Sequence, residues 1–520
     1  MMILRFCTFA LFSGISLWSF LAHGADKAET RPNIILIMCD DMGWSDIGCY
    51  GGEVNTPNLD RLAAEGLRFT QFYNNAKCTT TRASILTGLY PRRDRGGLLR
   101  TNMVTIGEAM KSAGYQTALS GKWHLGSDAQ THPFHRGFDE FYGLLDGCCN
   151  FFDPSIADPP YKGGKTRKFG RNDSLIHEFP EDFYTTDAFT DHAINCVNQF
   201  AKVDRPFLLH LCYTAPHYPL HAKPEDIAKY RGKFKELGGW YKMRQQRWDR
   251  LRTMGLADEH WSLSSGDDRA YDWDTADQDH EDLRMAVYSA MIDSMDQNIG
   301  RLRQSLEEAG VAENTVIFFL SDNGGCAEEP GGRSPGIVPG PKQYYASVGP
   351  SWGWAQNSPF KKHKSRSHEG GIGTPCIAWW PGRIQADTIT RQPAHIIDFM
   401  PTFLELAGAS YPSKQSAEEI LPVEGRSLVP ILDGKIREPH EQLAWEWSGS
   451  RALREGDWKV VWDSGGKQWE LYNLAVDRCE TQDLASADPE RVERLSAAWF
   501  NWAKRTGIMI KKPGRKTTKK

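Results

Sequence analysis

The amino-acid sequence predicts an α/β protein, in which helices cover both faces of a mostly parallel β-sheet and a smaller C-terminal antiparallel sheet with a helix follows. Three observations predict this class. Short, continuously apolar runs are typical of strands that are buried on both faces. Segments of helix-forming composition that end at a glycine alternate with these runs. From about residue 438, apolar and polar residues alternate between turn signals, as in antiparallel strands.

The predicted elements of the main sheet follow one another in order. The run NIILIMC (33–39) predicts the first strand, because it is apolar throughout and lies between Pro32 and Asp40. The first helix begins after Thr56 as N-cap, with Pro57 in its first turn, and ends at Gly66. Further helices are expected over 106–113 and about 285–309, and further strands in QTALS, PFLLHLCYTAPH and TVIFFLSDNGG.

Two regions do not follow this alternation of strands and helices: one lies within the main domain, and the other comes after it. Within the expected main domain (25–437), residues 221–282 form a charged, Trp-containing insertion, which either shapes a ligand crevice or lies as a solvated surface layer. Residues 438–508 are expected to form an α+β subdomain with turns at Glu455-Gly456 and Gly465-Gly466 and a helix over about 489–505. The basic tail (509–520) is expected to be a disordered, solvated end.

The N-terminus has the features of a secretory signal peptide over residues 1–24. Arg5 precedes an apolar run (6–21), and small residues surround Gly24, near which we expect cleavage. A membrane anchor is the alternative, but Ser and Gly interrupt the run, which is short for a span of about 20 residues. With a formal charge of −4 and no later apolar span, we expect a soluble periplasmic or secreted protein without stable membrane insertion or nucleic-acid partner.

The chain has 11 cysteines, of which Cys7 belongs to the expected signal peptide. Export permits disulfides. Cys39, Cys212 and Cys376, however, lie in apolar runs, where a free cysteine behaves as a small hydrophobic residue. We therefore do not expect a scaffold that is built on disulfides.

The predicted strands of the main sheet run into polar residues that can bind ions. These residues are Asp40 and Asp41, then Lys122 and His124, then His217, and then Asp322 and Asn323. Because ligands of open α/β sheets bind at the carboxyl ends of the strands, we expect all of them to converge on one crevice.

Three carboxylates and one amide oxygen in this set are hard ligands for a divalent cation. Asp40-Asp41 alone, or Asp322-Asn323 alone, would be typical of a turn. Three acids brought together, however, need a cation to offset their repulsion. Ca²⁺ fits this set best, and Mg²⁺ is the second choice because it keeps several waters. Zinc fits less well, since the His and Cys candidates are not spaced as ligands.

Cys78 is expected at the start of a helix, because Thr79, Thr80 and Thr81 favour helix starts and the residues after them suit a helix interior. The backbone N–H groups and the helix dipole favour an anion there. Arg82 lies four residues on, near the same face. A lone cysteine in an exported protein is otherwise most often buried or disulfide-bonded.

Further positive charge comes from Lys122 and from KKHKSRSHEGG, which contains Lys361, Lys362 and Lys364 and leads into the apolar strand TPCIAWW. Together with a divalent cation, Arg82, Lys122 and Lys364 exceed the three aspartates by about two positive charges. The crevice is therefore expected to bind a small anion.

CTTTRASILTG resembles the signature of the type I sulfatases, in which a Cys or Ser, an Arg four residues later and a following L-T-G mark the active site. Other segments are similar to that family in the same order: DDMGWSDIGCYGG, GKWHLG, TAPH, SDNGG, the lysine before HEGG, and RALREGDWKVVW with WELYNL. This likeness covers nearly the whole chain after the signal peptide. Within the family, the chain looks most like the bacterial arylsulfatases. The likeness implies an alkaline-phosphatase-like fold.

The resemblance also implies an activity. Cys78 would be oxidised to formylglycine by a formylglycine-generating maturase. One hydroxyl of the hydrated aldehyde would bind the metal and attack the sulfur of a sulfate monoester, and the second would later expel sulfate. The natural substrate would be a sulfated glycan, and small aryl sulfates would be hydrolysed as well.

The roles of the site residues are carried over from the family onto matching positions. Asp40, Asp41, Asp322, Asn323 and the modified Cys78 would bind the metal, Arg82 would fix the hydrate, and His124 would take a proton from the hydroxyl that expels sulfate. Lys122 and Lys364 would neutralise sulfate oxygens, and His217 with Lys364 would protonate the leaving oxygen. Lys364 is chosen over Lys361 and Lys362 because it stands five residues before Glu369, as in the family, whereas His363 and His368 have no assigned role.

Thr80 departs from the family pattern, which usually has Pro or Ala at that position, so conversion of Cys78 is expected either to be inefficient or to need a particular maturase. Two rival hypotheses remain. A phosphodiesterase or phosphonate monoester hydrolase on the same scaffold would use the same cations. An inactive glycan-binding relative would explain the 18 Trp residues. A calcium-stabilised structural protein would not explain why Arg82, Lys122 and Lys364 gather beside the metal.

Overall fold

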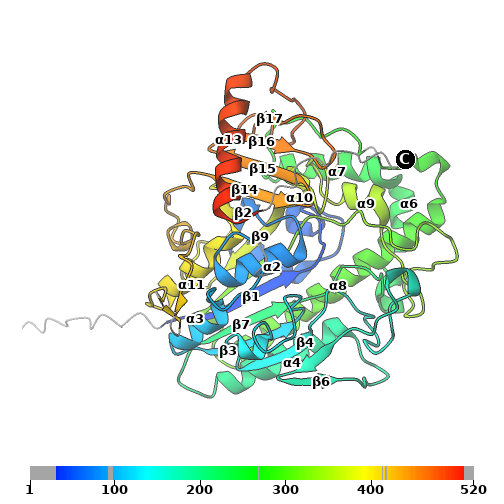
Figure 1. Ribbon diagram of the computed structural model, residues 1–520. Coiled ribbons are helices and arrows are strands. Elements are labelled where there is room, and N and C mark those ends of the chain that lie inside the picture. The colour runs from blue at the N-terminus through cyan, green and yellow to red at the C-terminus, as the bar shows by residue number, and fades with distance from the viewer. Residues whose placement is uncertain (1–30, 92–97, 268, 413, 416–417, 509–520) are drawn as a thin grey trace, which may run out of the picture. The chain divides into compact units, whose positions relative to one another are not determined.

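The computed structural model describes residues 31–91, 98–267, 269–412, 414–415 and 418–508. The expected signal peptide (1–24) and basic tail (509–520) lie outside the described residues. Figure 1 shows a large central sheet with helices on its two sides and a second, smaller sheet beside the C-terminal helix α13.

The central sheet of the described residues has eleven strands, and β1 lies between β7 and β8, parallel to both. Hydrogen bonding continues in parallel from β7 to β3 and β4. The predicted first strand and the three later ones are therefore confirmed. In spatial order the strands are β10 (Thr388–Thr390), β2 (Leu67–Tyr73), β9 (Gly373–Trp379), β8 (Thr315–Ser321), β1 (Asn33–Cys39), β7 (Phe207–Cys212), β3 (Gln116–Gly121), β4 (Glu140–Leu144), β5 (Phe169–Arg171) and β6 (Ser174–Ile176), while β11 (Ala394–His395) pairs with β2.

The sheet is mixed towards its ends. Strand β9, which carries TPCIAWW, runs antiparallel between β2 and β8. At the other end, β5 and β6 extend the sheet in antiparallel pairing. The parallel block from β8 to β4 holds all the strands whose ends were predicted to bear ion-binding residues, so their carboxyl ends lie on one edge.

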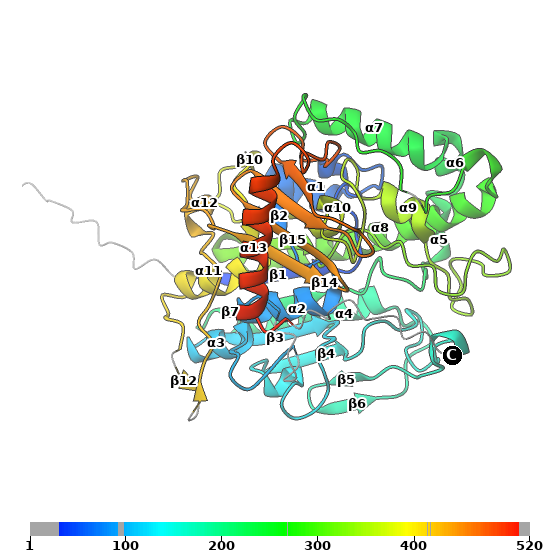
Figure 2. The ribbon, with the colours of Figure 1, turned by 45° about the horizontal axis from the view of Figure 1, so that its top comes forward.

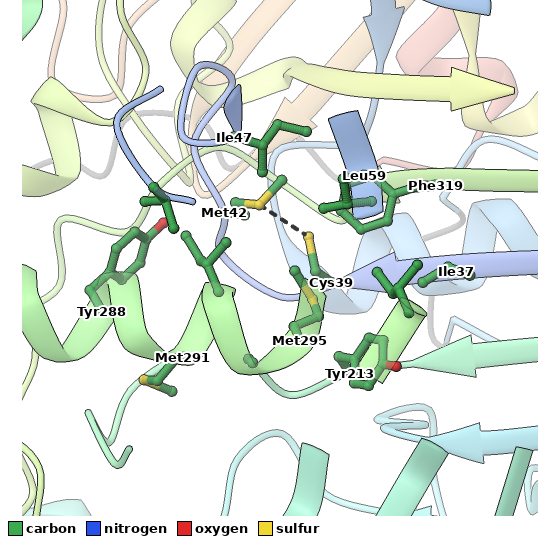
Figure 3. Packing of buried hydrophobic residues seen from close by; sticks show 14 of the residues in the cluster. Ile37, Cys39, Met42, Ile47, Leu59, Tyr213, Tyr288, Met291, Met295 and Phe319 are labelled. Atoms are coloured by element: carbon green, nitrogen blue, oxygen red, sulfur yellow. Dashed lines mark hydrogen bonds between the residues drawn. The ribbon is translucent and has the colours of Figure 1, made fainter. Parts of the chain in front are cut away.

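Strand β1 contributes to two apolar cores, because it is buried on both faces. Its odd-numbered side chains, such as Ile37 and Cys39, pack with α1 (Pro57–Ala64), α4 (Thr185–Phe200) and α8 (Gln278–Glu308). Its even-numbered side chains pack with α2 (Cys78–Thr87), α3 (Ile106–Ser112) and α11 (Phe399–Leu406). Figure 3 shows the first core, where the Cys39 thiol lies 3.9 Å from the Met42 sulfur and close to Met295 of α8. This burial on both faces is what the run NIILIMC predicts.

Helix α8 begins at Gln278, earlier than the predicted start near residue 285. The Asp277 side chain accepts the N–H of His280 and caps the helix, and Asp279 and Glu281 in the first turn complement the helix dipole. The predicted start of this helix is wrong because the charged residues of its first turn resemble the preceding insertion more than a helix.

The rest of the insertion forms α5 (Pro224–Ala228), α6 (Lys233–Leu237) and α7 (Gly239–Thr253), which Figure 2 shows along one side of the molecule's main unit. Trp240 and Arg247 of α7 are buried. The Arg247 guanidinium lies 2.7 Å from Asp46 and 2.5 Å from Glu53. Helix α7 therefore packs onto the segment that follows β1 and also contacts α9 (Gly349–Ala355), so it is no solvated surface layer.

The C-terminal sheet consists of β14 (Leu443–Trp447), β15 (Ser450–Glu455), β16 (Trp458–Trp462) and β17 (Glu470–Asn473), antiparallel in chain order. Helix α13 (Pro489–Arg505) packs on β15 and β16 (Figure 1). Gly456 and Gly465 have φ of 57° and 89°, which glycine adopts without strain, in the predicted turns. The predicted antiparallel sheet and helix are confirmed. The remaining short elements are α10 (Glu369–Ile372), α12 (Val429–Leu432), β12 (Lys414–Gln415) and β13 (Glu418–Glu419).

Four buried charged residues, Glu369, Lys459, Arg478 and Glu480, join the C-terminal sheet to α10, and we call them the C-terminal cluster. Lys459 Nζ lies 2.8 Å from one carboxylate oxygen of Glu369 and 2.8 Å from one of Glu480. The second oxygen of Glu369 accepts from Arg478 Nε and the Tyr73 hydroxyl, both at 2.9 Å. The second oxygen of Glu480 accepts the Glu369 N–H at 2.8 Å. Each carboxylate oxygen of this cluster therefore has a donor, which offsets the cost of burial.

All ten cysteines of the described residues are free and buried, including Cys39, Cys212 and Cys376. The expected burial of these three thiols is therefore confirmed. Among the described helices, none combines the length and the apolar character that a membrane span requires.

Candidate active site

The carboxyl ends of β1, β3, β7 and β8 meet at one edge of the sheet, and ten side chains gather there. We call them the strand-end cluster. Nine are buried and His124 is half-buried. Strands β1 and β8 lead into the acids, β3 and β7 lead into a lysine and two histidines, and α2 and the loop before α10 supply the rest. The members are Asp40, Asp41, Cys78, Arg82, Lys122, His124, His217, Asp322, Asn323 and Lys364. The structure thus brings together every site residue that the sequence predicted.

Asp41 lies at the centre of this cluster. Its Oδ1 is 2.6 Å from Lys364 Nζ and accepts a hydrogen bond from Asn323 Nδ2 at 2.7 Å. Its Oδ2 is 3.4 Å from His217 Nε2. Burial would raise the pKa of Asp41, but the charges of Lys364 and His217 outweigh it and bring the pKa below its ordinary value. Asp41 is therefore an anion.

Asp40 has a different environment. Its Oδ2 accepts a hydrogen bond from Lys122 Nζ, whereas its buried Oδ1 has no partner among the described residues. Burial and the charge of Asp322 raise the pKa of Asp40 to about 8, although Lys122 opposes them. A buried carboxylate oxygen without a donor is costly and is ready to bind a cation.

Arg82 is held in a fixed position by two bonds. Its Nη2 lies 2.8 Å from Asp322 Oδ2, and its Nη1 donates to the carbonyl of Lys122 at 2.8 Å. Asp322 Oδ1 also accepts the Asp41 N–H at 3.3 Å. Burial would lower the pKa of Arg82, but Asp322 and Asp40 raise it above its ordinary value. Asp322 therefore orients Arg82 and also faces the other two acids.

Cys78 is the first residue of α2, as predicted, and it is 2% exposed. The preceding turn is well ordered by hydrogen bonds: the Thr80 hydroxyl lies 2.9 Å from the carbonyls of Asn75 and Lys77. Ala76 in this turn has φ 59°, a strained value for a residue with a side chain. Thr80, the departure from the family pattern, thus closes the turn that positions Cys78.

The two histidines of the cluster are neutral at neutral pH. Burial, and then the charge of Lys122, brings the pKa of His124 well below its ordinary value. Burial also lowers the pKa of His217, although Asp41 opposes this. The His217 Nδ1 lies 2.5 Å from the Tyr218 carbonyl, so its Nε2 is the ring nitrogen that faces the cluster.

Backbone strain is concentrated here as well. Asp41 and His124 have φ of 68° and 63°, in the left-handed region that residues with a Cβ rarely adopt. A Cβ at Gly147 would lie 2.4 Å from the His124 ring, so only glycine leaves room for that ring. Conformations of this kind cost about 1–3 kcal/mol each and occur most often at functional sites.

Three of these side chains offer ligand atoms within 4.8 Å of one another: Asp40, Asp41 and His217. Asn323 Oδ1 is buried and, like Asp40 Oδ1, has no partner among the described residues. The donor set therefore fits a divalent cation. His217 Nε2 lies beside the same two aspartates, and Asp322, which is bonded to Arg82, also accepts the Asp41 N–H.

The neighbouring lysines and histidines lie outside this group. Lys361 Nζ lies 3.4 Å from Glu470, and Lys362 Nζ lies 3.7 Å from Asp267. His363 Nε2 accepts a hydrogen bond from the Arg269 guanidinium, and His368 Nε2 lies 2.8 Å from Glu470. Of the three candidate lysines, Lys364 is thus the one that reaches Asp41.

Sequence reasoning missed a second layer around Cys78 and His217. Lys77 Nζ lies 2.9 Å from one oxygen of Glu328, and the Tyr218 hydroxyl donates to the other at 2.5 Å. Burial would raise the pKa of Glu328, but Lys364 and Lys77 lower it to about 2. Lys77 and Tyr218 adjoin site residues in the chain, which was a usable signal, whereas Glu328 carried none.

Comparison with known proteins places this geometry in a family. Residues 32–409 match the sulfatase family model, and residues 360–497 match the N-sulphoglucosamine sulphohydrolase C-terminal model. An uncharacterised sulfatase of Schizosaccharomyces pombe is 30% identical, covering 94% of this chain and 96% of that protein. An arylsulfatase of Klebsiella aerogenes is 32% identical, covering 81% of this chain and 97% of that protein. The crystal structure of Ps i-CgsB in complex with k-i-k-neocarrahexaose superposes with a TM-score of 0.68 at 27% identity, covering 92% of this chain and 94% of that chain.

The sulfatase model covers most of the chain, and the matched residues contain the parallel block of the sheet and the whole strand-end cluster. The predicted α/β fold with its C-terminal antiparallel sheet is the fold of these relatives. The chain therefore belongs to the sulfatase family of sulfuric ester hydrolases.

Proposed function

We propose that this protein hydrolyses sulfate monoesters at the strand-end cluster with a nucleophile made from Cys78. The observation that carries the proposal is the position of Cys78 at the buried start of α2, beside Arg82, Lys122 and Lys364. A helix N-terminus and three cations together favour an anion of the size of sulfate. The arginine is already fixed by Asp322, so it needs no reorganisation when the anion binds.

Two groups would complete this site. Formylglycine at position 78, made by a maturase, supplies a hydrated aldehyde whose hydroxyl serves as the nucleophile. A divalent cation, preferably Ca²⁺, lowers the pKa of that hydroxyl and polarises the sulfate group. Asp40, Asp41, Asp322 and Asn323 would hold the cation, and the two buried oxygens without partners, Asp40 Oδ1 and Asn323 Oδ1, support this assignment.

The remaining side chains bind the sulfate group and move protons. Lys122 contacts Asp40 and Lys364 contacts Asp41, the two carboxylates that follow β1. Both lysines would neutralise sulfate oxygens next to the cation. The neutral His124 has an unpartnered Nδ1 with which it can take a proton. Lys364 would give a proton to the leaving oxygen, together with His217, whose Nε2 faces the cluster and can donate once the ring has taken up a second proton.

We propose a sulfated glycan as the natural substrate and export as the route to it. A glycan is supported by the relative that binds k-i-k-neocarrahexaose at 27% identity. Export is supported by the signal-peptide features of residues 1–24. Small aryl sulfates would react as well, because Arg82, Lys122 and Lys364 would bind the sulfate group, which aryl and sugar esters share.

The direct test is the mass of the peptide that contains Cys78, in protein co-produced with a formylglycine-generating maturase. Conversion of the thiol to the aldehyde lowers the mass by about 18 Da. Sulfate release from 4-nitrophenyl sulfate and from a panel of sulfated oligosaccharides is measured on the same sample. We expect activity to be proportional to the converted fraction and to be absent in Cys78→Ala. Full activity with an unaltered thiol would contradict the proposal.

The same preparation separates the rival hypotheses. 4-Nitrophenyl phenylphosphonate and bis(4-nitrophenyl) phosphate are offered at the same concentrations as the sulfate ester. We expect the sulfate ester to be preferred in kcat/KM. A preference for either phosphorus ester would support the phosphodiesterase or phosphonate hydrolase hypothesis, and tight glycan binding without turnover would support an inactive relative.

A further inference from the structure

We propose that the cavity beside Glu328 receives the part of the substrate beyond the sulfate ester, and that Lys162 binds a second anionic group there. The cavity has a volume of about 690 Å³, which lies within the range of about 300–1,000 Å³ that is typical of small-molecule sites. This inference rests on the proposed function and narrows its substrate class to sugars that carry a second sulfate or a carboxylate. The lining residues that matter are Lys162, Tyr218, Arg269, Tyr271, Glu328 and Glu329.

The cavity adjoins the strand-end cluster through side chains that contact or neighbour its members. Tyr218 follows His217, and their rings lie 4.1 Å apart between centroids. Glu328 is bonded to Lys77, which precedes Cys78. The charge of Lys364 lowers the pKa of Glu328 more than any other charge does. A group that leaves from a sulfate ester at Cys78 therefore faces this cavity.

Each carboxylate oxygen of the two acids on the wall already has a bonded partner in the protein. Both oxygens of Glu328 are taken, by Lys77 and the Tyr218 hydroxyl. Both oxygens of Glu329 are taken as well: one lies 2.8 Å from Arg284 Nη1, and the other accepts the Tyr271 hydroxyl at 2.9 Å. The acids are thus neutralised by cations, and they do not repel an anionic ligand as free carboxylates would.

The cations on the wall are less completely paired. Lys162 Nζ is bonded to the Tyr218 hydroxyl at 3.3 Å and lies 5.0 Å above the Tyr218 ring, and among the described residues it has no ion pair. Arg269 shares Asp267 with Lys362 at 3.6 Å and 3.7 Å and also contacts His363. Two cations, Lys162 and Arg269, thus line the cavity beside two acids that are each bonded to a cation outside the lining. The most available donor on the wall is the Lys162 ammonium group.

The path from this ammonium group to the reaction centre is short. Lys162 contacts Tyr218, the Tyr218 ring packs on His217, and His217 Nε2 lies 3.4 Å from Asp41. One tyrosine side chain therefore separates Lys162 from the proton donor proposed for the leaving oxygen. A substituent on the sugar that leaves, or on the next sugar, can reach Lys162 while the ester lies at Cys78.

The test compares Lys162→Met with Lys165→Met, a control variant in the same loop whose lysine is exposed and does not line the cavity. Three substrates are used with the matured, Ca²⁺-loaded enzyme: 4-nitrophenyl sulfate, a monosulfated disaccharide and its disulfated counterpart. For Lys162→Met we expect KM of the disulfated sugar to rise about tenfold, with kcat within about twofold. KM for the two other substrates should change less than about twofold. Lys165→Met should match the wild type throughout.

Two outcomes would overturn this inference: equal losses on all three substrates, or no loss on the disulfated sugar. Calorimetric titration of Cys78→Ala with the disulfated sugar measures the subsite without turnover. If the wild type hydrolyses none of the esters but binding still depends on Lys162, the proposed function fails and the subsite remains. If hydrolysis proceeds and neither KM nor Kd depends on Lys162, the subsite fails alone.

Discussion

The strand-end cluster and the C-terminal cluster are both buried groups of acids and bases, but they differ in how completely their atoms are bonded. In the C-terminal cluster, every carboxylate oxygen of Glu369 and Glu480 has a donor. In the strand-end cluster, Asp40 Oδ1 and Asn323 Oδ1 have no partner among the described residues. The C-terminal cluster thus has a donor for each carboxylate oxygen, although Arg478 Nη2 has no acceptor among the described residues. The strand-end cluster has acceptor oxygens that are free to bind a cation.

Charge balance sharpens this difference. Glu369 and Glu480 are matched by Lys459 and Arg478. The three aspartates of the strand-end cluster are matched by Arg82, Lys122 and Lys364. A cation and a sulfate group bring opposite charges, so both can enter the second cluster together without leaving a large net charge. Unpaired acceptor oxygens, and not charge as such, therefore distinguish the strand-end cluster from the C-terminal one.

The largest difference between the clusters is expected in catalysis. Asp40→Asn removes a proposed cation ligand, so we expect kcat/KM for 4-nitrophenyl sulfate to fall about 10⁴-fold, equivalent to about 5 kcal/mol in the barrier. The control is Asp46→Asn. Asp46 is a buried acid of the same segment whose oxygens are bonded to Arg247, Tyr288 and the Gly43 N–H. Its loss should affect stability and leave the activity of folded protein within about threefold. Equal activity losses would remove the distinction.

The C-terminal cluster is expected to control stability instead. Glu369→Gln leaves Lys459 and Arg478 with a weaker partner in a buried site, so the free energy of unfolding should fall by about 3–5 kcal/mol. Urea denaturation followed by tryptophan fluorescence measures this loss, and Glu493→Gln, on the exposed side of α13, should shift it by less than about 0.5 kcal/mol. If Glu369→Gln instead abolished activity and left the free energy of unfolding unchanged, the C-terminal cluster would have a role in catalysis.

Removal of the cation tests the unpaired oxygens directly. A ligand at 100 times its Kd stabilises the folded state by about 2.7 kcal/mol, so chelation of Ca²⁺ should lower the Tm of the wild type. Asp40→Asn should show little response to the chelator, whereas Glu369→Gln should respond as strongly as the wild type. A chelation response that is the same in all three proteins would place the cation elsewhere.

The smallest effect is expected in the dependence of stability on pH. Burial would raise the pKa of Glu369, but Lys459 and Arg478 lower it from 4.5 to about 2. A lowered folded-state pKa gives stability that is present above about pH 4.5 and is lost as the pH falls towards 2. The difference in unfolding free energy between wild type and Glu369→Gln should therefore shrink over that range. Parallel curves would show that Glu369 is not ionised in the folded chain.

Sequence patterns were sufficient where the chemistry is local. The apolar run before Asp40, the threonines after Cys78 and the glycines of the C-terminal turns each indicate their own structure, and the rule for strand ends brings the site together. Asp277 as the cap of α8 was also a local signal, but the charged residues after it resembled the insertion more than a helix.

The contacts that sequence reasoning missed are between residues far apart in the chain. Glu328 and Lys77 are 251 positions apart, and Lys459 and Glu369 are 90 positions apart. Neither pair belongs to a pattern with a fixed spacing, so no single-sequence rule could join them. The same is true of Arg247, since no spacing in the sequence joins this residue of the insertion to Asp46 and Glu53, which it contacts in the structure.

The burial of Cys78 determines when it can be modified. The residue is 2% exposed, forms the first turn of α2 and follows a turn closed by the Thr80 hydroxyl. In the proposed function, an enzyme that oxidises Cys78 would need the surrounding segment extended, so it would have to act before the chain folds. Folding would then compete with maturation, and any molecule that folds first would keep its thiol. The specific activity of a preparation would therefore record the conditions of its biosynthesis, and later exposure to the maturase would not improve it.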